Sequence, residues 1–434
     1  MTPSVSLLPQ QLSDLDVLCA KARGFVSDSR QVREGIIFVA LRGEAFDGAN
    51  FIEKTLSAQP GAFAVTQNKS VHAALPESMR ERTVLVEDAH LAHRHLAKNF
   101  RIKFTGKVIA IGGSNGKTST KEFLAHLLAS KFRIVKTQAS QNGELGIPKT
   151  LEQLHPVDGT PVDLAVIEVG IDGPGDMIRH VEIVRPHISV LTSIGEEHLN
   201  LLKNLEGVFR EERILADWCV DYGGRVVVPQ GDEFLERLVR EGKAIKATPT
   251  MLAKFQQPFT QKHFVSNLAL CVSVAKMLGM NDKEIQFALD TIAVPEGRGV
   301  LREHAPKVWV YEDYYNANSA SMKAGIDSSG DAARAKDLPF HLVLGDMFDL
   351  GDQESVVHNQ VLDYAISVKP HSITLIGERF AKAVKQMGVE SQVRNAYDTL
   401  EEAIADRAKI FSGPGVYLLK GSRGMRLEGL CRSK

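Results

Sequence analysis

Short runs of apolar residues, bounded by glycines and charged residues, recur along the chain and predict buried strands. In the first hundred residues such runs cover 35–41, 61–65 and 83–86. They are four to seven residues long and rich in Val, Ile and Phe, which is typical of strands. A helical pattern follows over 89–104. We therefore expect a small α/β domain over residues 1–104.

The next apolar run, 107–111, leads directly into a glycine-rich turn and then into a stretch with helical periodicity. A strand, a glycine-rich turn and a helix in this order are how a P-loop nucleotide-binding domain begins. Three further strand-like runs are separated by helix-compatible stretches, which predicts a mostly parallel sheet. These runs are 164–168, 188–192 and 225–228, and a helix over about 264–278 closes a domain expected to span residues 105–293.

A third α/β domain is expected over residues 294–434. It begins with a breaker between Pro295 and Gly299, and its strand-like runs alternate with helical patterns. The runs are 308–311, 341–344, 372–376 and 416–419. This alternation predicts a Rossmann-like fold, but no GxGxxG motif follows any of the strands, so dinucleotide binding is not indicated.

Composition and charge narrow the class of protein. The chain has 434 residues, enough for two or three domains, and a net charge of -1 that provides no global field for a nucleic acid or an anionic membrane. No run approaches the roughly 20 apolar residues that span a bilayer, and no secretory signal pattern is present, so we expect a cytoplasmic protein. Four distant cysteines without a CxxC motif are expected to be free thiols: Cys19, Cys219, Cys271 and Cys431.

The glycine-rich turn has the composition of a phosphate-binding loop. Gly113, Ser114, Asn115, Gly116, Lys117, Thr118 and Ser119 follow the strand without interruption. Glycines let backbone N–H groups approach a phosphate, the lysine adds a positive charge, and the threonine hydroxyl suits Mg²⁺. Ile111 stands where a strict GxxxxGK[ST] motif would have its first glycine. We predict an ATP site here.

The Gly-x-Asn-Gly-Lys-Thr form resembles the ATP loop of the Mur ligase family, the amide-bond-forming enzymes of peptidoglycan assembly. Further segments across the chain are similar, in the family's order, to the member that adds D-alanyl-D-alanine to UDP-N-acetylmuramoyl tripeptide. They are 27–30, 35–43, 142–148, 168–170, 194–199, 313–322, 344–351 with His358, and 420–426.

The resemblance implies an ATP-dependent ligase that proceeds through an acyl phosphate and requires Mg²⁺. Glu168 ends a predicted strand and His198 follows the next one, so both would project where ligands bind in open α/β sheets. By resemblance, Thr118 and Glu168 hold one Mg²⁺ and His198 helps to hold a second, while Lys117 contacts the phosphates. Two alternatives stay open: a related amino-acid ligase with another acceptor, and a nucleotide-binding pseudoenzyme.

Glu212 departs from the family pattern. It stands where the family carries a lysine that CO₂ converts to a carbamate, and Gly112 stands where a threonine is usual. Glutamate supplies a carboxylate without CO₂ but is shorter by three bonds, roughly 3.3–3.6 Å. We therefore expect Glu212 to act as a catalytic metal ligand only if its helix lies closer to the metal site or if a water bridges the gap. Otherwise the second metal site is weak or lost.

The remaining expected contacts also follow from the resemblance. Asn267 would contact adenine, and Arg298 and Asp313 would reach the phosphates and the ribose, so the third domain must close over ATP. The residues expected to bind the peptide and nucleotide substrates are Ser27, Ser29, Arg30, Gly43, Asn142, Tyr315, Asn316, Asn318, Lys420, Ser422 and Arg423. The implied partners are UDP-N-acetylmuramoyl tripeptide and D-alanyl-D-alanine, acted on by a monomer.

Overall fold

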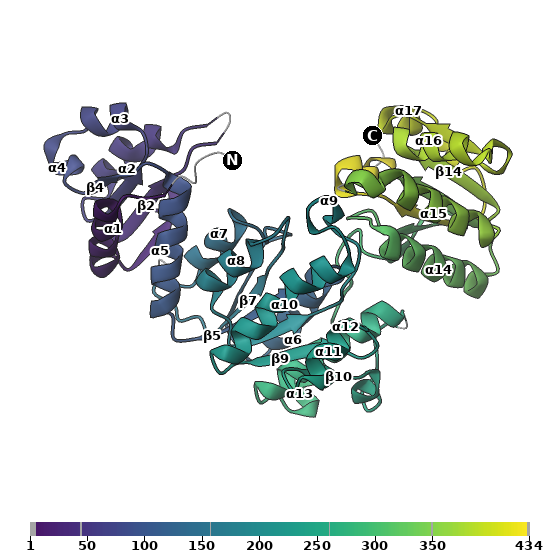
Figure 1. Cartoon of the computed structure of the whole chain (residues 1–434), viewed down its shortest axis with the longest axis horizontal. Coiled ribbons are helices and arrows are strands. Elements are labelled where there is room, and N and C mark those ends of the chain that lie inside the picture. Colours follow the sequence, from purple (N-terminus) through teal and green to yellow (C-terminus); the bar gives the residue numbers. More distant parts are fainter. Residues whose placement is uncertain (1–5, 44–45, 157, 260, 349, 432–434) are drawn as a thin grey trace.

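Three sheets follow one another along the chain, and each belongs to a separate part of an arc-shaped molecule (Figure 1). The computed structural model describes residues 6–43, 46–156, 158–259, 261–348 and 350–431. The expected α/β class with three sheets is confirmed. Among these described residues, no helix is both long and apolar enough to cross a bilayer.

The N-terminal part is a four-stranded parallel sheet in the order β1-β2-β3-β4. Helix α5 starts where the Asp88 carboxylate accepts hydrogen bonds from the amides of His90 and Leu91, a standard N-cap. The elements are α1 (Pro9–Lys21), β1 (Gly24–Val26), β2 (Ile36–Ala40), α2 (Ile52–Ala58), β3 (Phe63–Thr66), α3 (Lys69–Ala74), α4 (Glu77–Arg80), β4 (Thr83–Leu85) and α5 (Ala89–Lys103).

The central part is a six-stranded, wholly parallel sheet in the order β10-β9-β8-β5-β7-β6. Its strands are β5 (Lys107–Gly112), β6 (Ile134–Lys136), β7 (Leu164–Glu168), β8 (Ile188–Leu191), β9 (Arg225–Pro229) and β10 (Ile245–Ala247). Its helices are α6 (Lys117–Ala129), α7 (Gly146–Glu152), α8 (Asp176–Val184), α9 (Leu199–Leu202), α10 (Leu205–Asp221), α11 (Leu235–Arg240), α12 (Lys262–Met277) and α13 (Asp282–Leu289). Because β7 and β8 flank β5, the carboxyl ends of these three strands meet in one place, where ligands bind in such sheets.

The C-terminal part has a six-stranded sheet in the order β11-β12-β16-β13-β14-β15, in which only the β11–β12 pair is antiparallel. Its strands are β11 (Val300–Ala305), β12 (Val308–Glu312), β13 (Phe340–Gly345), β14 (Ser372–Ile376), β15 (Asn395–Tyr397) and β16 (Gly415–Lys420). Its helices are α14 (Ser319–Lys336), α15 (Glu354–Ser367), α16 (Glu378–Met387), α17 (Leu400–Ala405) and α18 (Arg407–Ile410).

The N-terminal and central parts share one hydrophobic core, whereas the C-terminal part has its own. Leu96 and Phe100 of α5 pack in the same buried cluster as Val108 of β5 and Leu151 of α7. The C-terminal sheet is buried around residues such as Leu342 and Leu418. The domain boundaries expected after residues 104 and 293 fall between α5 and β5 and between α13 and β11, and they stay predictions.

Candidate active site

The turn between β5 and α6 has the backbone that the glycine pattern requires. Gly113 and Gly116 have φ values of +105° and +88°, in the left-handed region that favours glycine. A Cβ on Gly113 would lie 2.6 Å from Oγ1 of Thr192, so a side chain there would also collide with the loop after β8. That loop supports the turn, since the amide of Asn115 donates to Oγ of Ser193 at 3.0 Å.

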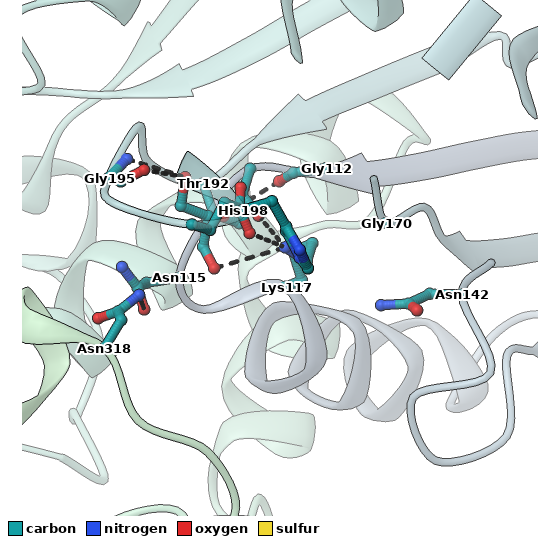
Figure 2. Close-up of polar contacts among 12 residues, drawn as sticks. Gly112, Asn115, Lys117, Asn142, Gly170, Thr192, Gly195, His198 and Asn318 are labelled. Carbon is teal, nitrogen blue, oxygen red and sulfur yellow. Dashed lines mark hydrogen bonds and ion pairs between the residues drawn. The ribbon is translucent and has the colours of Figure 1, made fainter. Parts of the chain in front are cut away.

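Lys117 lies under this turn among carboxylates. Its ammonium donates to the carbonyl of Gly113 and forms an ion pair with Glu197 at 3.3 Å, and Figure 2 shows the lysine at the centre of these contacts. Burial by itself would lower the pKa of Lys117, but the carboxylates of Glu197, Glu212 and Glu168 raise it above its ordinary value. Three acidic side chains therefore surround this lysine beside the turn.

Two of these acids have oxygens that suit a hard cation. Glu168, at the end of β7, accepts hydrogen bonds through Oε1 from the Thr118 hydroxyl at 3.0 Å and the Asn142 amide at 2.8 Å. Its Oε2 has no hydrogen-bond partner among the described residues, although the Lys121 ammonium is 3.4 Å away. Oε1 of Glu197 is also buried without such a partner. Buried carboxylate oxygens left unpartnered are the ligands that Mg²⁺ takes.

His198 follows the same loop and faces the same space. It has a left-handed backbone, with φ of +48°, where it precedes α9. A left-handed backbone is uncommon for a residue other than glycine and is found at functional sites. Its Nε2 is 3.7 Å from a carboxylate oxygen of Asp172. Nothing in the sequence predicted Asp172 or Glu197 at the site, because they approach His198 and Lys117 only where separate loops meet.

Glu212 lies behind the turn rather than in the open space in front of it. It comes from α10, is 0% exposed, and neither carboxylate oxygen has a well-formed hydrogen bond to the described residues. Burial raises the pKa of Glu212 to about 8, while Lys117 and, more weakly, the Gly113 amide oppose the shift. The carboxyl is therefore mostly protonated at neutral pH when no cation is present.

The C-terminal part reaches across to the turn through two hydrogen bonds. The side-chain amide of Asn318 donates to that of Asn115 at 2.8 Å, and Figure 2 shows Asn318 approaching from the C-terminal ribbon. The hydroxyls of Tyr315 and Ser140 are 2.5 Å apart. The guanidinium of Arg298 lies 4.0 Å above the Tyr315 ring, which is a cation–π contact. The two parts thus contact each other beside the phosphate loop.

Lys420 ends β16 and anchors the C-terminal side of this space. It is 2% exposed, pairs with Asp313 at 2.7 Å and donates to the carbonyl of Asn316 at 3.0 Å. Ser422 is also buried, and its hydroxyl accepts a hydrogen bond from the amide of Phe348 at 2.9 Å. Ser422 therefore supports the local fold and does not line the cleft.

These groups border one cleft of about 650 Å³ between the central and C-terminal parts. All residues expected to be catalytic or to bind nucleotide or metal line it, except Gly113 and Glu212. Six of the expected substrate-binding residues line it as well: Asn142, Tyr315, Asn316, Asn318, Lys420 and Arg423. Their roles in binding stay predictions.

The four expected substrate residues of the N-terminal part lie in or near a second cavity, of about 560 Å³, between the N-terminal and central parts. Ser27, Ser29 and Arg30 line it. Gly43 does not, but its amide donates to the carbonyl of Phe46, whose ring stacks on that of Phe51 at 5.5 Å inside the cavity lining. The aromatic pair and Lys149, which also lines the cavity, were not expected from the sequence, since isolated Phe and Lys residues carry no motif.

Consecutive residues line the two cavities. Gln141 lines the second cavity and Asn142 lines the main cleft. One extended ligand could therefore occupy both, with one end held between the N-terminal and central parts and the other beside the phosphate loop.

Comparison with known proteins agrees with this geometry. Residues 111–289 match the family model of the Mur ligase middle domain. The UDP-N-acetylmuramoyl-tripeptide–D-alanyl-D-alanine ligase of Synechocystis is 30% identical over 362 residues, covering 77% of this chain and 75% of that protein. The ligase of the same name from Bacillus subtilis is 27% identical and covers 94% and 92%.

Solved structures show the same architecture. The crystal structure of MurF from Acinetobacter baumannii matches with a TM-score of 0.76 and 25% identity over 98% of each chain. MurF from Thermotoga maritima, solved in complex with ADP, has the same fold, with a TM-score of 0.74 and 24% identity over 95% of this chain and 96% of that one. The chain belongs to the Mur ligase family, among the UDP-N-acetylmuramoyl-tripeptide–D-alanyl-D-alanine ligases.

Proposed function

We propose that this chain is an ATP-dependent ligase that joins D-alanyl-D-alanine to UDP-N-acetylmuramoyl tripeptide in peptidoglycan precursor synthesis. The observation that carries this proposal is that consecutive residues, Gln141 and Asn142, line the two cavities. A nucleotide-linked peptide is long, and its two ends need different surroundings. The diphosphate end suits the cavity with Arg30 and Lys149, and the reacting carboxylate must reach the phosphate loop.

The cleft residues fit ATP and Mg²⁺. The backbone amides of the turn and Lys117 are placed to bind the phosphates. Thr118 and Glu168 would hold one cation and His198 would help to hold a second, and Glu197 adds a carboxylate with a buried, unpartnered oxygen. Bound Mg²⁺ would screen the repulsion between the triphosphate and the substrate carboxylate. That Glu212 ligates a second cation stays a prediction, because its carboxyl faces Lys117 from behind the turn.

The reaction then has two steps. A carboxylate oxygen of the tripeptide attacks the γ-phosphorus, and ADP leaves. The amine of D-alanyl-D-alanine next attacks the acyl carbon, loses a proton, and inorganic phosphate leaves. In this chain Lys117 would hold the phosphates in line, while Lys420 and Arg423 would bind the carboxylate of the dipeptide. Closure of the C-terminal part over the cleft would exclude water from the acyl phosphate, which water would otherwise hydrolyse.

We further propose that the enzyme acts in the cytoplasm, as a monomer, and without nucleic-acid or membrane partners. The net charge of -1 supports this, since it provides no field for a polyanion.

The test is phosphate release from ATP and Mg²⁺ with the tripeptide and the dipeptide added separately and together, followed by the product mass. Turnover only with both, and a product of pentapeptide mass, is the expected result. Lys117→Met is the matched control and should bind both peptides but release no phosphate. Sustained phosphate release without the dipeptide, or a product of another mass, would reject the proposed acceptor. ATP binding without any turnover would indicate a pseudoenzyme.

A further inference from the structure

Three side chains that commonly bind transition metals meet at the edge of the C-terminal sheet, outside the cleft. His304 lies on the edge strand β11, Glu312 is the last residue of β12, and Cys431 follows the short helical turn Leu427–Leu430. One ligand atom of each lies within 4.8 Å of the others. Nε2 of His304 is 2.9 Å from Oε1 of Glu312. None of the three residues has a role in the proposed ligase reaction.

The donor set selects a class of metal. An imidazole nitrogen, a carboxylate oxygen and a thiolate sulfur together suit Zn²⁺, whereas Mg²⁺ and Ca²⁺ take oxygen ligands. Zn²⁺ binds these atoms at about 2.0–2.3 Å, so tetrahedral ligand atoms are about 3.3–3.8 Å apart. To bind Zn²⁺, Nε2 of His304 and Oε1 of Glu312 would have to move apart by about 0.5 Å, and Sγ of Cys431 would have to approach them by about 1 Å. The His304 side chain, 20% exposed on an edge strand, has room for this adjustment.

The charges of the cluster also favour a divalent cation. Glu312 is 4% exposed, and its other oxygen is 3.5 Å from Nε of Arg302, a half-exposed side chain. A thiolate and a carboxylate would neutralise the two charges of Zn²⁺.

We propose that His304, Glu312 and Cys431 form a Zn²⁺ site with a fourth position open to water. The ion would join the C-terminal segment to the β11–β12 hairpin. It would also fix the end of β12 next to Asp313, the residue that pairs with Lys420 in the cleft.

The test uses Co²⁺ as a spectroscopic substitute for Zn²⁺ on the full chain, with excess Mg²⁺ and ADP to occupy the cleft. One equivalent of Co²⁺ should produce thiolate-to-metal charge-transfer absorption, and Zn²⁺ should abolish it by displacement. Cys431→Ser should lose this absorption, and Glu312→Gln should weaken Co²⁺ binding by about tenfold or more. Cys19→Ser, a buried cysteine outside the cluster, is the matched control and should leave the spectrum unchanged.

His304→Asn is a second variant, chosen because its partly exposed position on the edge strand makes unfolding of the protein less of a concern. It should keep the wild-type circular dichroism and bind Co²⁺ about tenfold or more weakly. No charge-transfer absorption in the wild type at stoichiometric Co²⁺ would overturn the proposal. Full absorption in Cys431→Ser would overturn it as well.

Discussion

Gly112 and Glu212, two positions where the sequence is expected to depart from the family pattern, lie against each other. A Cβ on Gly112 would lie 2.7 Å from Oε2 of Glu212 and 2.9 Å from Cδ2 of Leu215. The end of β5 and helix α10 are therefore packed together with no space for a side chain at residue 112. A threonine there would not fit beside the glutamate, so the two departures compensate each other.

Gly112→Ala is expected to destabilise the protein by about 1–3 kcal/mol, the usual cost of overpacking a buried site. The free energy of unfolding, from urea denaturation, measures this. Gly143→Ala is the matched control, because a Cβ there has nothing within 4 Å and its cost should be under about 0.5 kcal/mol. In a Glu212→Ala background the cost of Gly112→Ala should fall. An unchanged cost would show that Leu215, and not Glu212, limits the space.

Glu212 should make stability depend on pH. Its pKa is about 8 in the folded state against an ordinary value of 4.5, so between these values the folded protein binds more protons than the unfolded chain. The contribution of Glu212 to the free energy of unfolding of the wild type therefore falls as the pH rises from about 5 to 8, by at most about 1.4 kcal/mol per pH unit. The unfolding free energy of Glu212→Gln relative to wild type should rise over this range. A difference independent of pH would contradict the raised pKa.

Ligase activity should not depend on CO₂. Glu212 carries its own carboxylate, so this position needs no carbamate. Steady-state rates in CO₂-depleted buffer and in added bicarbonate should agree within error. A rate that falls on depletion and returns with bicarbonate would place the required carboxylate on another residue.

Tyr315 should contribute to catalysis through both its hydroxyl and its ring. Tyr315→Phe loses the hydrogen bond to Ser140 and should lower kcat/KM for ATP by about 2- to 10-fold, or about 0.5–1.5 kcal/mol. Tyr315→Ala also loses the Arg298 contact and should cost a further 0.5–1 kcal/mol, approximately. Steady-state kinetics at varied ATP distinguish the two variants. Equal losses would mean that the ring contact contributes nothing.

Arg30→Ala should separate the two cavities functionally. Arg30 lines the second cavity and not the main cleft, so its loss should raise KM for the UDP-linked tripeptide by roughly tenfold and leave KM for ATP unchanged. Lys54→Ala is the matched control, because Lys54 is an exposed residue of α2 that does not line this cavity. Its loss should change neither KM. A comparable rise in KM for ATP would argue that the N-terminal cavity communicates with the cleft.

Much of the fold follows from local pattern. All eleven apolar runs expected to be strands are strands in the structure, and the helix expected near residues 264–278 is α12. The missed strands are short or polar. Four of them, β1, β6, β10 and β15, have three residues each, too few to show a period. Strand β11 contains Arg302, Glu303 and His304 and is largely exposed, so it lacks the apolar signature.

The phosphate loop could be recognised in the sequence because its requirements are local. Gly113 and Gly116 are needed for left-handed backbone at fixed positions within a few residues, and Lys117 and Thr118 follow at once. The ion pair between Lys117 and Glu197, the contact of Gly112 with Glu212 and the bond between Asn115 and Asn318 join residues 80 to 203 positions apart. Such approaches depend on strand order and domain closure, which no local spacing encodes, and so they became visible only in the folded chain.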